Sequence, residues 1–129
     1  MARTAATITP AQVGFLTERR LGTLTTVRLD GTPHVVAIAF TFDAATRSVW
    51  IITSDRTRKV KNVEAKQRAA VCQVDGARWM TLEGRAEVVR DTDRVAAAVA
   101  AYEIRYRPAR PNPERVAIEI QVDRIMGRS

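Results

Sequence analysis

Asp-Gly pairs between short runs of β-branched and apolar residues constrain this chain more than any other feature. Such a pair is typical of a tight hairpin turn, because glycine adopts the backbone φ that these turns need. The sequence has two such pairs, Asp30-Gly31 and Asp75-Gly76. Each joins two predicted antiparallel strands. The six predicted strands cover Leu21–Arg28, Pro33–Phe42, Val49–Thr53, Ala69–Val74, Trp79–Val89 and Arg115–Ile125.

Two of these strands have different apolar patterns. Pro33–Phe42 is apolar on both faces, which suits a barrel strand covered from outside by a helix or a partner subunit. Trp79–Val89 alternates apolar and polar residues and is predicted to be half-buried. Gly84 within it indicates a bulge or a bend. Cys72, in the strand before it, is expected to be a buried and inert thiol.

Three short helices are predicted between the strands. The first starts at Pro10, with Thr9 as its cap and Gln12 completing a capping box. The others cover about 57–66 and 92–106. The last carries an apolar stripe, which is typical of core packing. That stripe comprises Val95, Val99, Tyr102 and Tyr106.

Hairpin-connected strands with few helices predict one domain over residues 1–129, built as a small antiparallel barrel. The chain lacks the βαβ pattern and the GxGxxG motif of nicotinamide dinucleotide sites. One histidine, His34, and one cysteine make a metal centre unexpected. No apolar run is long enough to span a membrane, and the N-terminus has no signal-like core, so a cytoplasmic location is expected.

The chain is basic, with a net charge of +7, which favours an anionic partner. Nucleic acid is not expected, because aromatic residues make up 5% of the chain and most occupy core-like positions. The densest basic run follows the third strand, at Arg56–Lys61. A strand end, a polar loop and a helix start could bind a phosphate there through free backbone N–H groups. The other interpretation is a solvated basic face.

Four segments match the pattern of a known fold family. They are Leu24–Arg28, Asp30–Val36, Trp50–Thr53 and Arg58–Asn62. These resemble the split β-barrel flavin and deazaflavin oxidoreductases, which are relatives of pyridoxamine 5'-phosphate oxidase. A second set comprises Cys72–Trp79, Leu82–Ala86, Arg105–Arg107 and Arg110–Pro113. This set is similar to the actinobacterial branch that uses the deazaflavin coenzyme F420, and within it to biliverdin reductases.

The resemblance implies a mainly β fold, a six- to seven-stranded antiparallel split β-barrel (an FMN-binding split barrel) with short flanking helices. It also implies a homodimer with cofactor sites at the subunit interface. The phosphate would lie at Thr53, Ser54, Arg58 and Lys59. The ring would lie against the second strand and near residues around it. The implied ring-side residues are those of about His34 to Ile38, among them His34, Val35, Val36 and Ala37, together with Ile52, Gln73 and Trp79. Val60 is also implied as a cofactor-binding residue.

The implied activity is hydride transfer from reduced coenzyme F420 to a conjugated small molecule, with a biliverdin-like tetrapyrrole favoured. Such chemistry belongs mostly to the cofactor. No side chain is assigned as a catalytic proton donor. Basic side chains around the opening of the cofactor site could bind the propionates of a tetrapyrrole. Two alternatives remain open: an FMN-dependent oxidase or reductase of the same fold, and a protein that carries the cofactor or haem without turnover.

Overall fold

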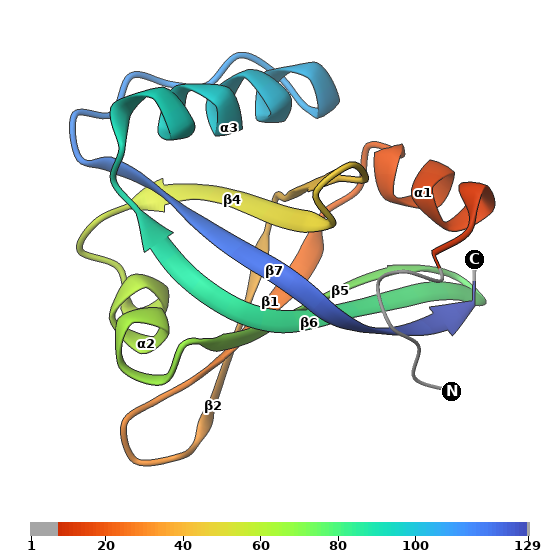
Figure 1. The fold of residues 1–129 in the computed structure, drawn as a ribbon, viewed down its shortest axis with the longest axis horizontal. Helices are drawn as coiled ribbons and strands as arrows, with labels where there is room; N and C mark the ends of the chain where they lie inside the picture. The colour runs from red at the N-terminus through yellow and green to blue at the C-terminus, as the bar shows by residue number, and fades with distance from the viewer. Residues whose placement is uncertain (1–7, 129) are drawn as a thin grey trace.

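The computed structural model describes residues 8–128. The chain forms one antiparallel seven-stranded sheet with the order β2-β1-β5-β6-β7-β4-β3, flanked by helices (Figure 1). The predicted mainly β class is confirmed. In chain order the elements are α1 (Pro10–Thr17), β1 (Gly22–Val27), β2 (Pro33–Ile38), β3 (Thr41–Asp43), β4 (Ser48–Ser54), α2 (Arg58–Lys66), β5 (Arg68–Asp75), β6 (Arg78–Val89), α3 (Thr92–Arg105) and β7 (Arg115–Arg128).

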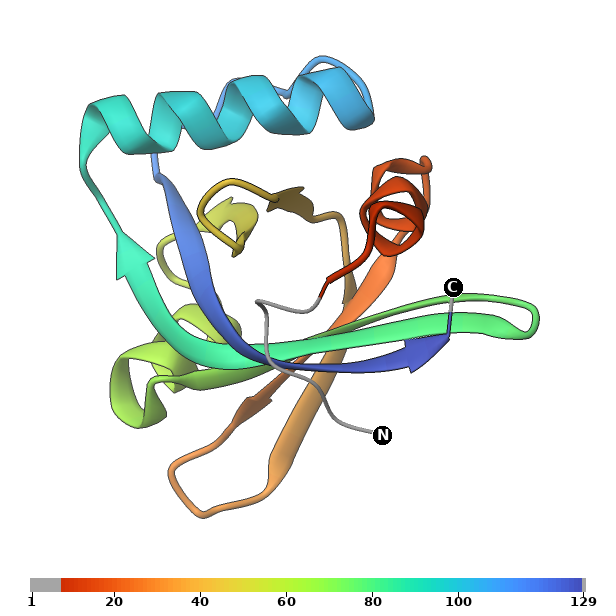
Figure 2. The same cartoon turned by 45° about the vertical axis from the view of Figure 1, so that its right-hand side comes forward.

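The sheet curls because its two edge strands are neighbours in the chain. β2 and β3 lie at opposite ends of the strand order, yet Ala39 and Phe40 alone separate them. Three peptide units span at most about 11 Å, so the two edges come close together. No hydrogen-bonded ladder joins β2 to β3 within residues 8–128, which leaves the barrel split at this seam. Figure 2 shows the curvature in the long strands β6 and β7.

The prediction of one continuous strand over Pro33–Phe42 is wrong. The chain leaves the sheet at Ala39 and Phe40 because the backbone of Phe40 is bonded elsewhere. Its N–H donates to the hydroxyl of Tyr106 (3.2 Å), and its carbonyl accepts from the guanidinium of Arg105. The end of α3 therefore holds the seam between the two edge strands.

The helix starts follow from capping. The predicted capping box of α1 is present: the N–H of Gln12 donates to Thr9 Oγ1 (3.2 Å), and the N–H of Thr9 donates to Gln12 Oε1 (2.9 Å). Asp91 caps α3 by accepting from the N–H of Arg94 (2.9 Å). By contrast, Thr57 at the start of α2 makes no side-chain capping bond.

The core lies inside the curled sheet and includes Leu24, Ile51, Leu82 and Ile118, each at most 1% exposed. β6 bends here, since its register against β7 shifts between Glu83 and Gly84, which confirms the predicted bulge. A Cβ atom at Gly84 would lie 1.9 Å from the carbonyl oxygen of Gln121. The close approach of β6 and β7 therefore requires glycine at this position.

Two burial predictions are wrong. The side chain of Cys72 is partly exposed, because the alternation of β5 turns its neighbours Val71 and Gln73 inward instead. The predicted stripe on α3 is only half-buried, and Ala98 is the buried residue of this helix. The reason is that α3 covers a small satellite cluster rather than the main core. This position leaves Tyr102 at the wall of a cavity.

The outward face of β2 is uncovered within one chain. Val35 is 57% exposed and Ala37 is also exposed, whereas Val36 and Ile38 face inward. The prediction that both faces of this strand are covered is therefore not met by a single chain. An apolar edge strand of this kind is a surface on which another chain can pack.

Candidate functional site

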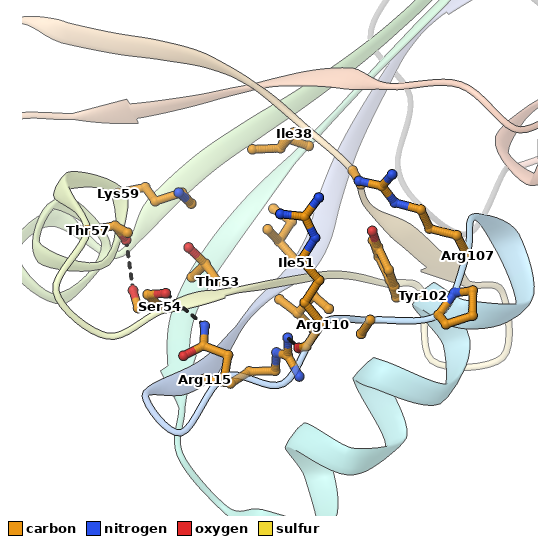
Figure 3. Close-up of a pocket in the computed structure, with 15 residues that line it drawn as sticks. Ile38, Ile51, Thr53, Ser54, Thr57, Lys59, Tyr102, Arg107, Arg110 and Arg115 are labelled. Carbon is orange, nitrogen blue, oxygen red and sulfur yellow. Dashed lines mark hydrogen bonds between the residues drawn. The ribbon is translucent and has the colours of Figure 1, made fainter.

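A cavity of about 540 Å³ lies between the end of β4, the start of α2 and the loop that joins α3 to β7. This size suits a small-molecule ligand. Its floor is apolar and is formed by Ile38, Ile51 and Ile52. Its polar rim comprises Thr53, Ser54, Thr57, Lys59, Arg107, Arg110, Asn112 and Arg115 (Figure 3). The remaining lining comes from Ala39, Tyr102, Pro108 and Ala109. We call this space the main cavity.

The start of α2 forms one end of the main cavity. The first turn of this helix contains no acidic residue and carries Arg58 and Lys59 instead. Helix starts favour negative charge, so these two cations raise an already positive potential. The hydroxyl of Thr57 donates to the carbonyl of Ser54 (3.0 Å). It accepts no hydrogen bond from α2, so the first N–H groups of this helix have no side-chain acceptor. An anion is the partner that this end lacks.

Lys59 lines this end and is half-buried. Burial lowers the pKa of its ammonium group. No carboxylate pairs with Lys59 in the part of the chain that the structure describes. A half-buried cation without a partner costs free energy, so a bound anion would stabilise it.

The opposite wall is the proline-containing loop between α3 and β7. Asn112 fixes this loop to β4, since its Nδ2 donates to Ser54 Oγ (2.8 Å), and its Oδ1 accepts from the N–H of Glu114 (3.0 Å). The guanidinium of Arg115 donates to the carbonyl of Arg110. Figure 3 shows Arg107 and Arg110 reaching from this loop toward the space opposite Lys59. Among residues 8–128, no carboxylate lines the main cavity.

The structure brings together four of the residues predicted as cofactor ligands: Ile52, Thr53, Ser54 and Lys59 all line the main cavity. His34 and Val36 lie on the same face of β2 as Ile38, which belongs to the cavity floor. Val35 and Ala37 point to the opposite face and are exposed. Neither His34 nor Val36 lines the main cavity itself, and Val36 packs against the main core.

Four other predicted residues lie outside the main cavity. Arg58 is exposed on α2. Val60 and Gln73 are both 0% exposed and belong to the interior. Trp79 is 38% exposed and lies at the far end of β6, opposite Val74. Within one chain, these side chains do not reach the space beside Lys59.

His34 has an unusual environment. Its Nδ1 atom is buried and has no hydrogen-bond partner within the described residues. Burial lowers the pKa of its imidazole, and the positive charges of Arg28, Lys59 and Arg58 lower it further. No acidic group contributes to this shift. An anion bound near Lys59 would oppose these charges and raise the pKa of His34 again.

Gln73 takes part in a buried network centred on Arg105. The guanidinium of Arg105 donates to the carbonyl of Glu18 (2.7 and 2.9 Å), to the carbonyl of Phe40 and to Gln73 Oε1 (2.6 Å). Gln73 Nε2 in turn donates to the carbonyl of Phe15 (2.8 Å). The network ties α1, β5, the strand seam and α3 together. It supports Ala39 and Tyr102, which lie in the cavity wall next to it.

Sequence reasoning assigned no binding role to Arg107, Arg110, Asn112 or Arg115. The sequence did contain a hint of a basic, stiff binding loop, because residues 107–113 include two arginines and three prolines. Proline predicts a stiff loop but not the direction in which that loop runs. Within residues 8–128, no group of three or more metal-binding side chains occurs, and no helix is long and apolar enough to cross a membrane.

A split seven-stranded barrel with an apolar floor and a basic rim at a helix start defines a split-barrel protein with a site for an anionic cofactor. The family model described as pyridoxamine 5'-phosphate oxidase matches residues 8–128. The chain belongs to this family.

Individual relatives agree with this assignment. An F420H(2)-dependent biliverdin reductase from Mycobacterium tuberculosis is 46% identical over 127 residues, covering 98% of this chain and 93% of that protein. A solved structure of a conserved hypothetical protein from Mycobacterium tuberculosis has a TM-score of 0.82 at 23% identity, covering 95% of this chain and 85% of the other. A structure described as an F420 reductase has a TM-score of 0.75 at 24% identity, covering 92% and 98%. These two structures share the fold.

Proposed function

We propose that the protein is a coenzyme F420-dependent reductase that transfers hydride from the reduced deazaflavin to a biliverdin-like tetrapyrrole. The observation that carries this proposal is the 46% identity to an F420H(2)-dependent biliverdin reductase over almost the full length of both chains. When bound, the reduced deazaflavin would supply one hydride, which carries both electrons of the reduction. The protein binds this cofactor, orients it toward the substrate and shields it from water.

The main cavity fits the chemical groups of this cofactor. Lys59 and the first N–H groups of α2 would hold the phosphate, because both lack an anionic partner at this end of the cavity. Ile52, with the nearly buried Ile38 beside the cavity, offers an apolar surface for a planar ring. The positive charges of Arg58 and Lys59 at the start of α2 would also attract the acidic glutamyl tail, which follows the phosphate. Every charge on the cavity lining is positive within residues 8–128, as a polyanionic ligand requires.

A comparison of cofactors tests the function. We expect coenzyme F420 to bind at least about tenfold more tightly than FMN, because its glutamyl tail adds carboxylates that can pair with the basic rim. Fluorescence titration measures both dissociation constants. Mixing the protein with reduced F420 and biliverdin should then oxidise the cofactor at a rate proportional to protein concentration.

Two outcomes would contradict this function. Equal or tighter binding of FMN would make the protein a flavin enzyme of the same fold. Tight binding of F420 without oxidation of the reduced cofactor by biliverdin would make it a carrier. The same titration at several salt concentrations serves as a control, since a phosphate contact weakens as salt rises.

We propose further that the protein works as a cytoplasmic homodimer, with β2 in the subunit interface. The exposed apolar residue Val35 supports this arrangement, and so does the position of β2 at the sheet edge. A single cysteine, which cannot form an internal disulfide, fits a reducing compartment.

Light scattering at micromolar concentration should return about twice the chain mass of 14.3 kDa. Val35→Glu should shift the protein toward the monomer, because it places a charge in an apolar interface. Ile104→Glu is the matched control, since Ile104 is 89% exposed on α3. A monomer mass for the unaltered chain would contradict the dimer.

A further inference from the structure

A second cavity adjoins the main one behind Tyr102. It measures about 240 Å³, and we call it the arginine cavity. Its lining comprises Arg19, Arg20, Leu21, Ala39, Tyr102, Tyr106 and Arg107. Three of these residues, Ala39, Tyr102 and Arg107, also line the main cavity. The two spaces therefore lie next to each other and share these three residues as a common wall.

The cations of the arginine cavity are not equivalent. Arg20 is neutralised by Glu18 (3.4 Å) and by Asp75 (3.0 Å). Arg19 and Arg107 have no ion-pair partner among the described residues. Two free guanidinium groups beside one small cavity suit a carboxylate, which arginine binds through two parallel hydrogen bonds.

The apolar part of the arginine cavity suits a flat conjugated body. Tyr102 and Tyr106 pack against each other with their ring centres 5.3 Å apart. The hydroxyl of Tyr106 is already engaged, since it donates to the carbonyl of Arg20 (2.7 Å). Tyr106 is therefore fixed, and the ring of Tyr102 is the aromatic surface that both cavities share.

The position of this cavity argues against a role in holding the cofactor's phosphate end. Figure 3 shows Lys59 on one side of the main cavity and Tyr102 with Arg107 on the other. A cofactor anchored by its phosphate at α2 would extend its ring away from Lys59, and its tail would leave on the phosphate side. The arginine cavity opens beyond the far wall, where a second reactant could approach the ring.

We infer that the arginine cavity binds a carboxylate of the second reactant, with Arg19 and Arg107 as its ligands and Tyr102 as the surface for its conjugated body. This inference rests on the proposed function, because it places the substrate beside a cofactor in the main cavity. The cavity would recognise a carboxylate side chain of the planar conjugated substrate that the proposed function names. Arg19 is the specificity residue, since it lines this cavity and not the main one.

Arg19→Gln tests the assignment with biliverdin and its dimethyl ester as probes. We expect KM for biliverdin to rise roughly five- to tenfold, as for the loss of one partly screened charged contact. The kcat value and the dissociation constant of F420 should stay unchanged. The ester lacks the carboxylates, so its KM should be the same for Arg19→Gln and the unaltered protein. Arg124→Gln is the control, because it removes the same charge and lines neither cavity.

Three results would overturn the inference. Weaker binding of F420 by Arg19→Gln would assign the cavity to the cofactor's acidic tail. An equal rise in KM for the acid and the ester would show that no carboxylate is recognised. An unchanged KM for both would remove Arg19 from the site. If the protein does not oxidise reduced F420 at all, the proposed function fails, and absorbance titration of the cofactor-free protein with both probes still tests the arginine cavity.

Discussion

Replacing Arg105 with methionine should lower the free energy of unfolding by about 3–5 kcal/mol, because buried acceptors left without a donor cost about 1–3 kcal/mol each. Methionine keeps the apolar length of the side chain but donates no hydrogen bonds. The carbonyl of Glu18 and the amide oxygen of Gln73 would both lose their guanidinium donor. Urea unfolding followed by circular dichroism measures the change.

Arg105→Lys separates the charge from the hydrogen-bonding geometry. Lysine keeps the positive charge but cannot reach three acceptors with a planar fork, so we expect an intermediate loss of stability. Arg124→Met is the control, since the Arg124 side chain is 60% exposed and its contact with Glu83 is long, at 3.6 Å. A loss below about 1 kcal/mol for Arg105→Met would show that water replaces the guanidinium at the seam.

Lys59→Gln should weaken the binding of coenzyme F420 about ten- to a hundredfold, as expected for the loss of a charge-assisted contact of roughly 1.5–3 kcal/mol. The cofactor-free variant should be as stable as the unaltered protein or slightly more stable. The reason is that the substitution removes a half-buried ammonium group that has no partner in the described chain. Fluorescence titration gives the affinity, and thermal unfolding without cofactor gives the stability.

Lys61→Gln is the matched control for Lys59. It removes the same charge from the same helix, and Lys61 is exposed and outside the cavity lining. Its effect on affinity should be no more than about twofold, since an exposed charge acts through screened long-range forces. Equal effects of the two substitutions would mean that α2 attracts the cofactor only through its general positive potential.

The regular parts of the fold were predictable because their signals are local. The Asp30-Gly31 turn, the capping box at Thr9 and the bulge at Gly84 each depend on a few neighbouring residues, and all three are present. The break between β2 and β3 was not predictable in this way. It depends on hydrogen bonds from Arg105 and Tyr106, which lie more than sixty residues further along the chain.

The site was predictable in part for the same reason. The end of β4 and the start of α2 are contiguous in sequence, so Thr53, Ser54 and Lys59 lie together as expected. Gln73 in β5 could not be recognised as an interior residue, because its burial depends on a partner in α3. No binding role could be assigned to the loop arginines from sequence, because the path of that loop is set by a distant contact between Asn112 and Ser54.

Cofactor binding at the uncapped start of α2 should stabilise the folded protein, so the amount of cofactor in the cell should affect how fast the protein is degraded. A ligand that binds only the folded protein stabilises it by mass action, by about 2.7 kcal/mol when its concentration is a hundred times its dissociation constant. At α2 the bound ligand would contact N–H groups that no side chain caps and two cations in the first turn. In a cell that lacks the deazaflavin, the protein would therefore be both inactive and less stable. Proteases that act on opened molecules would remove that unloaded pool first.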